Sequence, residues 1–155
     1  MVPDLNTKNV ALLMPLSIVA KDYQLPTKTI FQWTGQVIHG ESMGKTIGFP
    51  TANLDLVPQE SELKTGVYLG QCQLANSLDQ YYCLIYFGPK LVLGQTTNVF
   101  EVNLFNFDQQ IYGQTVVVGL QKYLRAPKKF AHFEELKEQL TNDLYQAQSL
   151  IKTKG

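Results

Sequence analysis

The chain has 155 residues, of which 45% are hydrophobic and 17% charged, and its 13 basic residues balance its 13 acidic ones. A chain of this length is one domain with a core of its own. The balanced charge, without runs of Lys or Arg, lacks the electrostatic footprint of a nucleic-acid-binding protein, so we expect no nucleic-acid partner.

The first 30 residues have no clear hydrophobic periodicity and contain Pro3, Pro15 and Pro26, so we interpret residues 1–30 as an N-terminal extension of unknown role. Their longest apolar run, residues 10–20, contains a proline and is too short to cross a bilayer. It also lacks the positively charged segment and the cleavage site of a secretory signal. We therefore expect no membrane partner and a cytoplasmic location.

From Phe31 the pattern changes to short runs rich in Val, Ile, Tyr, Phe and Thr, each bounded by Gly, Pro, Asn or Asp. This spacing, without helical segments between the runs, predicts an antiparallel barrel or sandwich and argues against a doubly wound α/β fold. The predicted strands are residues 31–38, 66–75, 80–87, 99–107 and 115–124. The long connection over residues 40–65 is of a length that is usually functional or disordered.

After the last predicted strand, apolar residues recur at spacings of three and four from Phe133 to Ile151, which predicts a C-terminal helix. Glu134 and Glu135 in its first turn suit the helix dipole. Cys72 and Cys83 are not part of a CxxC motif, so we interpret both as reduced strand residues, with a disulfide between neighbouring strands as the alternative.

The long connection contains the stretch Gly44–Asn53, which has the composition of a phosphate and metal site. Its glycines let backbone N–H groups approach an anion, and Lys45 supplies positive charge. The Thr51 hydroxyl and the Asn53 amide oxygen are hard ligands of the kind that Mg²⁺ accepts. For both residues the alternative is turn chemistry, in which the side chains bond their own backbone.

Residues 40–46 resemble a Walker A loop in composition but not in spacing. That motif has four residues between its first glycine and Gly-Lys-Thr, and here there are three. Gly48 and Pro50 follow directly and would break the helix whose N-terminus should face the phosphates. A P-loop NTPase is therefore disfavoured.

Strand alternation along residues 99–107 separates an apolar face from a face that carries a carboxylate. The apolar face holds Phe100, Val102 and Leu104, and the other holds Glu101, Asn103, Phe105 and Phe107. Glu101 is either a solvated acid on the outside of a half-buried strand or a general base whose neighbours limit its solvation. The second interpretation requires that Glu101 face the region of Thr51 and Asn53.

The only arginine, Arg125, either clamps the junction between the last strand and the helix or reaches a planar or phosphorylated ligand. His39 and His132 are not at metal-ligand spacing, and we interpret both as structural or surface residues.

Six motifs occur in order along the chain. They are Gly35-x-Val37-x-His39-Gly40, Gly44-Lys45-x-x-Gly48-Phe49-Pro50-Thr51-Ala52-Asn53, Gly66-Val67-Tyr68, Phe100-Glu101-Val102, Asp108-x-x-x-Tyr112-Gly113 and Leu124-Arg125 followed by Lys129-Phe130. Together they resemble the riboflavin kinase family, including the kinase module at the C-terminal end of bacterial bifunctional FAD synthetases. The Pro-Thr-Ala-Asn segment with its upstream glycines is the most specific part of this resemblance.

The resemblance implies a mainly β fold, a six-stranded Greek-key β-barrel with a C-terminal α-helix, over residues 31–152. It implies transfer of the γ-phosphate of ATP to the 5′-hydroxyl of riboflavin, giving FMN and ADP, with Mg²⁺ or another divalent ion as cofactor. We expect riboflavin/FMN and ATP/ADP as partners, and a monomer. We expect no FAD synthesis, because the sequence has no His-x-Gly-His motif and no adenylyltransferase module.

By the same resemblance, Glu101 is the catalytic base that takes the proton from the ribityl hydroxyl, and Arg125 binds the flavin. Thr51 and Asn53 help to hold the metal ion with the nucleotide phosphates. The residues assigned to ATP binding are Gly40, Gly44, Lys45, Gly48, Thr51 and Asn53.

The sequence departs from the family pattern at two places. Asn103 stands where the family usually carries a His, and Leu91 lies in a segment that lacks the Pro-Thr often found there. These departures keep open a non-catalytic flavin- or nucleotide-binding barrel derived from such a kinase. A β-barrel interaction module is disfavoured, because it gives no reason for the glycine loop, the Pro-Thr-Ala-Asn segment and Glu101 to occur together.

Overall fold

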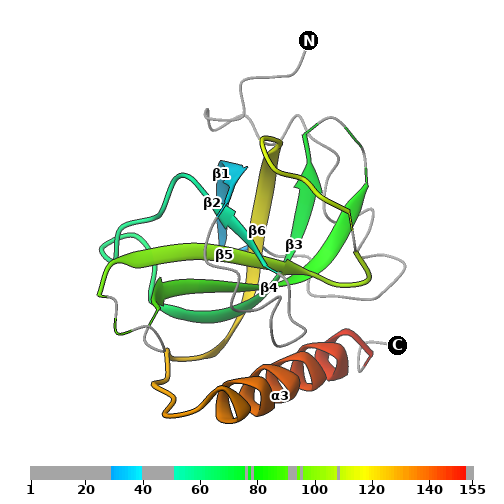
Figure 1. Ribbon diagram of the computed structural model, residues 1–155. Helices are drawn as coiled ribbons and strands as arrows, with labels where there is room; N and C mark the ends of the chain where they lie inside the picture. Colours follow the sequence, from blue (N-terminus) through cyan, green and yellow to red (C-terminus); the bar gives the residue numbers. More distant parts are fainter. Residues whose placement is uncertain are drawn as a thin grey trace.

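The computed structural model describes residues 29–39, 51–75, 77, 79–90, 94, 96–107 and 109–152. Within these ranges the chain forms six strands and a C-terminal helix (Figure 1). The elements are β1 (Phe31–Ile38), β2 (Ala52–Leu54), β3 (Gly66–Leu74), β4 (Gln80–Pro89), β5 (Asn98–Leu104), β6 (Thr115–Arg125) and α3 (Phe133–Lys152).

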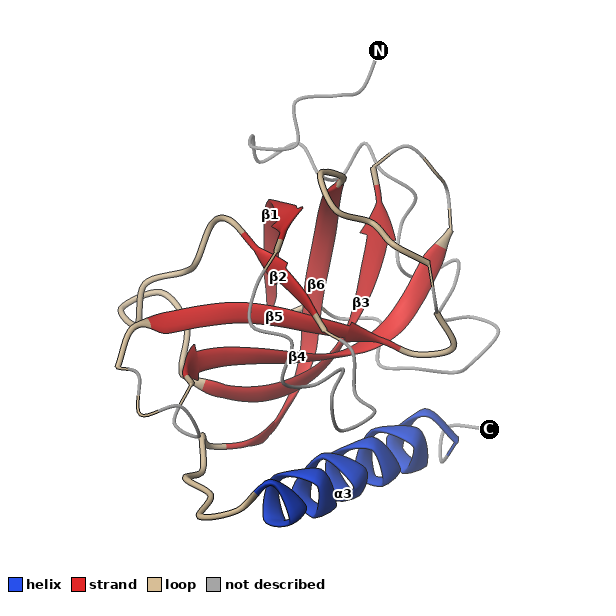
Figure 2. Cartoon of the chain, in the orientation of Figure 1, coloured by secondary structure: helices blue, strands red, loops and turns tan. Residues whose placement is uncertain are grey.

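The strands close into one antiparallel barrel in the order β1-β2-β5-β4-β3-β6. β3, β4 and β5 are consecutive neighbours, and β6 returns to lie beside β3, which is the Greek-key arrangement. Figure 2 shows the barrel with α3 running along its outside. The predicted six-stranded Greek-key barrel with a C-terminal helix is thus confirmed.

The barrel interior is apolar because alternate residues of every long strand point inward. Phe100 and Val102 of β5 are fully buried there, as the alternation predicted, whereas Leu104 is only half-buried. Other buried members of this interior are Val37, Leu54, Tyr68, Ile85, Phe87, Val116, Val118 and Leu120. The interior therefore fixes which strand residues must point outward.

A second apolar layer lies between the outside of the barrel and α3. Val67 and Leu69 of β3 and Leu84 of β4 pack there with Ala147 of the helix. β3 is buried along its whole length, and this layer covers the outward side chains of its first half. The 3.6-residue period of α3 supplies the apolar stripe that covers this part of the barrel.

Strand boundaries differ from the predicted ones where turn chemistry was not evident from the sequence. The short strand β2 lies inside the predicted connection over residues 40–65, so that connection is not wholly irregular. β5 ends at Leu104 rather than at Phe107, because a turn follows in which Asn106 takes a φ of 54°. Asn tolerates this left-handed conformation better than most residues.

Both cysteines are free thiols within the barrel interior, which confirms the interpretation as reduced strand residues. Burial raises the pKa of Cys72 from 9.0 to about 12. Burial, with the neighbouring Cys72 as a second cause, also raises the pKa of Cys83.

These raised pKa values predict a loss of stability at alkaline pH. The unfolded chain loses its thiol protons first, so the contribution of the thiols to the free energy of unfolding should stay constant below about pH 8.5 and fall as the pH rises further. Urea unfolding between about pH 8 and pH 10 should show a smaller fall for the double variant Cys72→Ala/Cys83→Ala than for the wild type. Equal falls in the two proteins would contradict a contribution from the thiols.

The predicted extension over residues 1–30 and its apolar run lie outside the described residues, except for residues 29 and 30. Within the part of the chain that the structure describes, no helix has the length and apolar character needed to span a membrane.

Candidate active site

A row of paired residues crosses the outer face of the barrel. Asn53 of β2 lies directly opposite Glu101 of β5, and Glu101 lies opposite Tyr86 of β4. The row continues from Tyr86 to Val67 of β3, and from Val67 to Arg125 at the end of β6. Because directly opposite residues of antiparallel strands share a face, Asn53, Glu101 and Tyr86 lie side by side outside the apolar interior.

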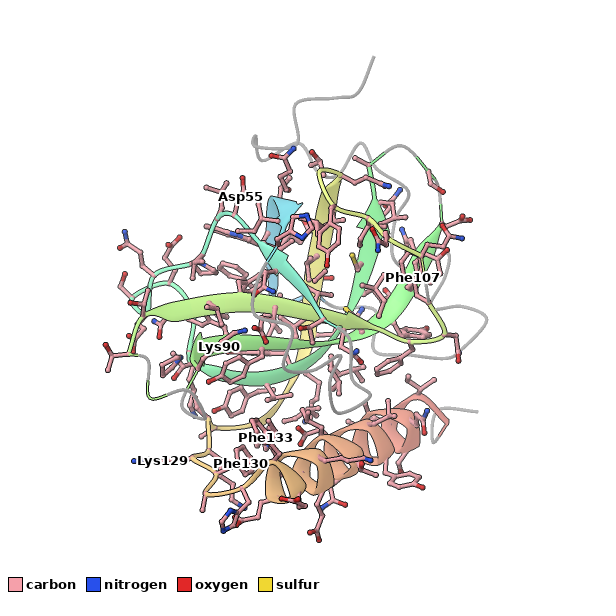
Figure 3. All side chains as sticks on the ribbon, in the orientation of Figure 1. Asp55, Lys90, Phe107, Lys129, Phe130 and Phe133 are labelled. Atoms are coloured by element: carbon pink, nitrogen blue, oxygen red, sulfur yellow. The ribbon has the colours of Figure 1, made fainter. Side chains whose placement is uncertain are left out.

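Glu101 is not a freely solvated surface acid. Its side chain is 14% exposed, and its Oε1 lies 2.8 Å from Nζ of Lys90, whose side chain is 10% exposed. Lys90 directly follows β4, and Figure 3 shows its side chain lying over β4 and β5. The interpretation of Glu101 as a general base required that it face the region of Thr51 and Asn53. Glu101 does lie opposite Asn53 on the neighbouring strand.

Tyr86 separates Glu101 from Arg125 in the row. Burial is the main cause that raises the pKa of Tyr86 to about 12; the negative charge of Glu101 adds to the effect, and the positive charge of Arg125 opposes it. The Tyr86 phenol therefore keeps its proton at neutral pH. Its hydroxyl donates a hydrogen bond to the backbone carbonyl of Pro89, the residue before Lys90.

Asn53 is 8% exposed, and Thr51 is half-buried just before β2 begins. Their amide and hydroxyl oxygens suit Mg²⁺, which is usually bound by few protein ligands and completes its shell with phosphate and water oxygens. The donor set therefore fits the ion implied by the family. The other residues assigned to ATP, namely Gly40, Gly44, Lys45 and Gly48, lie outside the described residues.

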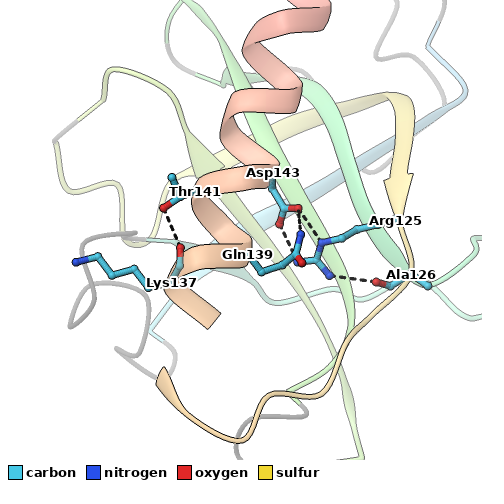
Figure 4. A network of polar contacts seen from close by, with 6 residues as sticks. All are labelled: Arg125, Ala126, Lys137, Gln139, Thr141 and Asp143. Atoms are coloured by element: carbon cyan, nitrogen blue, oxygen red, sulfur yellow. Dashed lines mark hydrogen bonds and ion pairs between the residues drawn. The ribbon is translucent and has the colours of Figure 1, made fainter. Parts of the chain in front are cut away.

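Arg125 joins the barrel to the helix (Figure 4). Its Nε and Nη2 donate to the two carboxylate oxygens of Asp143 at 2.7 Å each, and its Nη1 donates to the carbonyl of Ala126. Gln139 also donates to Asp143, which is 1% exposed. Of the two predicted roles of Arg125, the structure shows the clamp between strand and helix.

Three residues of this region were missed by sequence reasoning: Lys90, Tyr86 and Asp143. Lys90 reads as a loop lysine after Gly-Pro, and Tyr86 as one more aromatic residue of a strand. Their contacts join residues of different strands, so no local spacing reveals them. A signal existed for Asp143 alone, because it interrupts the apolar stripe of the predicted helix.

The structure is thus a closed Greek-key barrel with an acid and an amide paired on its outer face. The chain belongs to the riboflavin kinase family: the family model described as Flavokinase, riboflavin kinase, matches residues 27–151. The family resemblance drawn from the motifs is thereby confirmed.

The curated relatives that this chain matches are longer proteins. A bifunctional riboflavin kinase/FMN adenylyltransferase of Haemophilus influenzae is 36% identical over 119 residues, covering 77% of this chain and 38% of the relative. The Bacillus subtilis protein of that name is 36% identical over 114 residues, covering 73% of this chain and 36% of the relative. The chain thus spans little more than a third of the length of these relatives.

Two solved structures share the architecture. A Streptococcus pneumoniae protein described as a macrolide-efflux protein aligns with a TM-score of 0.65 and 28% identity, covering 95% of this chain and 46% of that one. Riboflavin kinase from Trypanosoma brucei aligns with a TM-score of 0.58 and 19% identity, covering 78% of this chain and 76% of that one. The second likeness concerns the fold alone.

Proposed function

We propose that this chain is a riboflavin kinase that transfers the γ-phosphate of ATP to the 5′-hydroxyl of riboflavin and releases FMN and ADP. The observation that carries the proposal is the direct pairing of Asn53 with Glu101 across β2 and β5. This pairing brings the amide that we assign to the metal next to a carboxylate that can accept a proton. Family membership supports the same reaction.

In the proposed mechanism the protein mainly positions the reactants, as phosphoryl transfer requires. The ribityl oxygen attacks the γ-phosphorus, the bond from that phosphorus to the bridging oxygen breaks, and ADP departs. Glu101 orients the hydroxyl and accepts its proton late in the step, because an alcohol is far less acidic than a carboxylic acid. The limited exposure of Glu101 strengthens its interactions with the substrate.

The remaining assignments are proposals of the same kind. Thr51 and Asn53 would hold Mg²⁺, which would supply positive charge to neutralise the nucleotide phosphates. Arg125 would lie beside the flavin with its guanidinium held in place by Asp143. The glycines 40, 44 and 48, together with Lys45, would cover the nucleotide.

We further propose that the chain acts as a monomer in the cytoplasm, over a domain of residues 31–152 that follows the extension. Closure of the barrel supports the monomer, because it leaves no free strand edge among the residues that the structure describes. The two unpaired thiols support a reducing compartment.

The proposal is tested by incubating the protein with riboflavin, ATP and Mg²⁺, separating the flavins by chromatography, and titrating riboflavin binding in parallel. FMN should accumulate in proportion to the protein added. If riboflavin binds but no FMN forms with any of the divalent ions tested, the result would instead favour the non-catalytic flavin-binding barrel.

The metal assignment predicts that Thr51→Ala and Asn53→Ala each raise the Mg²⁺ concentration needed for half-maximal activity. Each substitution removes one oxygen ligand, so the ion is held less tightly. The matched control is Asn142→Ala, the same change at an exposed position of α3, whose Mg²⁺ titration should coincide with that of the wild type. Unchanged titrations for both site variants would count against the assignment.

A further inference from the structure

Lys90 forms a mostly buried ion pair with the proposed base, and the mechanism above gives it no role. Its side chain is 10% exposed, and its Nζ lies 2.8 Å from Oε1 of Glu101. Lysine is almost never buried to this extent unless its charge is paired. The low exposure of both side chains distinguishes the contact from a solvent-exposed surface ion pair, which contributes little.

Tyr86 and Gly88 fix the backbone from which Lys90 extends. The Tyr86 hydroxyl donates to the carbonyl of Pro89, which immediately precedes Lys90. Gly88 has a φ of 155°, a conformation that side-chain-bearing residues rarely adopt. A Cβ at that position would also lie 2.9 Å from the Tyr86 hydroxyl oxygen. The glycine thus allows the hydroxyl to reach Pro89.

The direction of the Lys90 side chain follows from this anchoring. Pro89 is the last residue of β4 and pairs with Asn98, three residues before Glu101 on β5. Lys90 must therefore run back along the outer face of β4 and β5 to reach the carboxylate. Its four-carbon stem spans that interval, while the Tyr86 hydroxyl holds the end of β4 in place.

We propose that Lys90 is a positioning residue for Glu101, with Tyr86 holding Lys90 in place through Pro89. The inference rests on the proposed kinase function, because it gives Lys90 a task only if Glu101 accepts a proton. Lys90 binds Oε1 and so restricts rotation of the carboxylate, which leaves Oε2 to face the substrate hydroxyl. A base already held in one orientation needs less reorganisation in the transition state.

The test is steady-state kinetics of FMN formation by the full chain carrying Lys90→Met, which removes the charge and keeps a long side chain. We expect kcat to fall by at least about 10-fold, with KM for ATP and for riboflavin within about two-fold of the wild type. Lys90→Arg, which restores a cation, should recover most of the lost kcat. Lys137→Met, at an exposed position on α3, is the matched control and should keep wild-type kinetics.

A double variant separates a positioning role from an independent one. If Lys90 acts through Glu101, adding Lys90→Met to Glu101→Gln should lower kcat no further than Glu101→Gln alone. Losses that multiply in the double variant would show that Lys90 acts by another route and would overturn the inference.

A wild-type protein that makes no FMN would refute the proposed function itself. An active wild type with unchanged kcat in Lys90→Met would overturn only the role of Lys90. If Lys90→Met does not fold, as judged by circular dichroism, Tyr86→Phe decides: a lowered kcat at unchanged KM supports the inference, and an unchanged kcat overturns it.

Discussion

Replacing Glu101 with Gln is expected to lower kcat for FMN formation by at least about 10²-fold, the usual scale for loss of a general base. Glutamine keeps the shape of the side chain and can still accept a hydrogen bond, but it cannot take up the hydroxyl proton. ATP binding should change much less, because Glu101 is not among the residues assigned to the nucleotide. The measurement is initial-rate kinetics together with an ATP titration.

Two controls accompany this variant, because Glu101→Gln also leaves the Lys90 ammonium without its charge partner. Glu138→Gln makes the same chemical change on an exposed part of α3 and should leave kcat unaltered. Urea unfolding of Glu101→Gln shows whether enough folded protein remains for the rates to be compared. Near-normal turnover in folded Glu101→Gln would mean that another group takes the proton.

Replacing Arg125 with Met is expected to lower the free energy of unfolding by about 3–5 kcal/mol, the cost of breaking a buried ion pair by removing one partner. Asp143 is 1% exposed and would be left with Gln139 as its remaining donor among the contacts described above. The helix would also lose its bidentate attachment to β6. Urea denaturation of wild type and variant measures the difference.

The double variant Arg125→Met/Asp143→Leu tests the cause of this loss. Removing both charges replaces the pair with apolar groups, so most of the lost stability should return. Riboflavin affinity then separates the two roles of Arg125. If the guanidinium binds the flavin, the affinity for riboflavin should be lower than that of the wild type in the single variant and in the double variant alike. A loss of less than about 1 kcal/mol in Arg125→Met would contradict a structural clamp.

The sequence predicted the long elements because their patterns are local. Strand β1 and the start of β3 coincide with the runs of β-branched and aromatic residues, and α3 follows its period of three and four. The strand β2 was missed because three residues are too few to show alternation. It forms through pairing with β1 and β5, and this pairing is not visible in the segment itself.

For the candidate site, too, the sequence predicted local features but not tertiary contacts. Glu101 and Asn53 were identified as chemically suitable, but their pairing depends on the register between β2 and β5, which no spacing along the chain reveals. The ion pair of Glu101 with Lys90 and the hydroxyl contact of Tyr86 are likewise tertiary features. The residue types of the site were predictable from the sequence, whereas the partners that contact them were not.

The most direct test of the kinase assignment follows the phosphate itself. ATP labelled at its γ-phosphate is incubated with riboflavin, Mg²⁺ and the protein, and the purified flavin product is analysed for label. The account predicts that the label appears in FMN with the wild type, at one phosphate per flavin, and falls sharply with Glu101→Gln. Recovery of all the label in ATP or inorganic phosphate, with riboflavin unchanged, would contradict it.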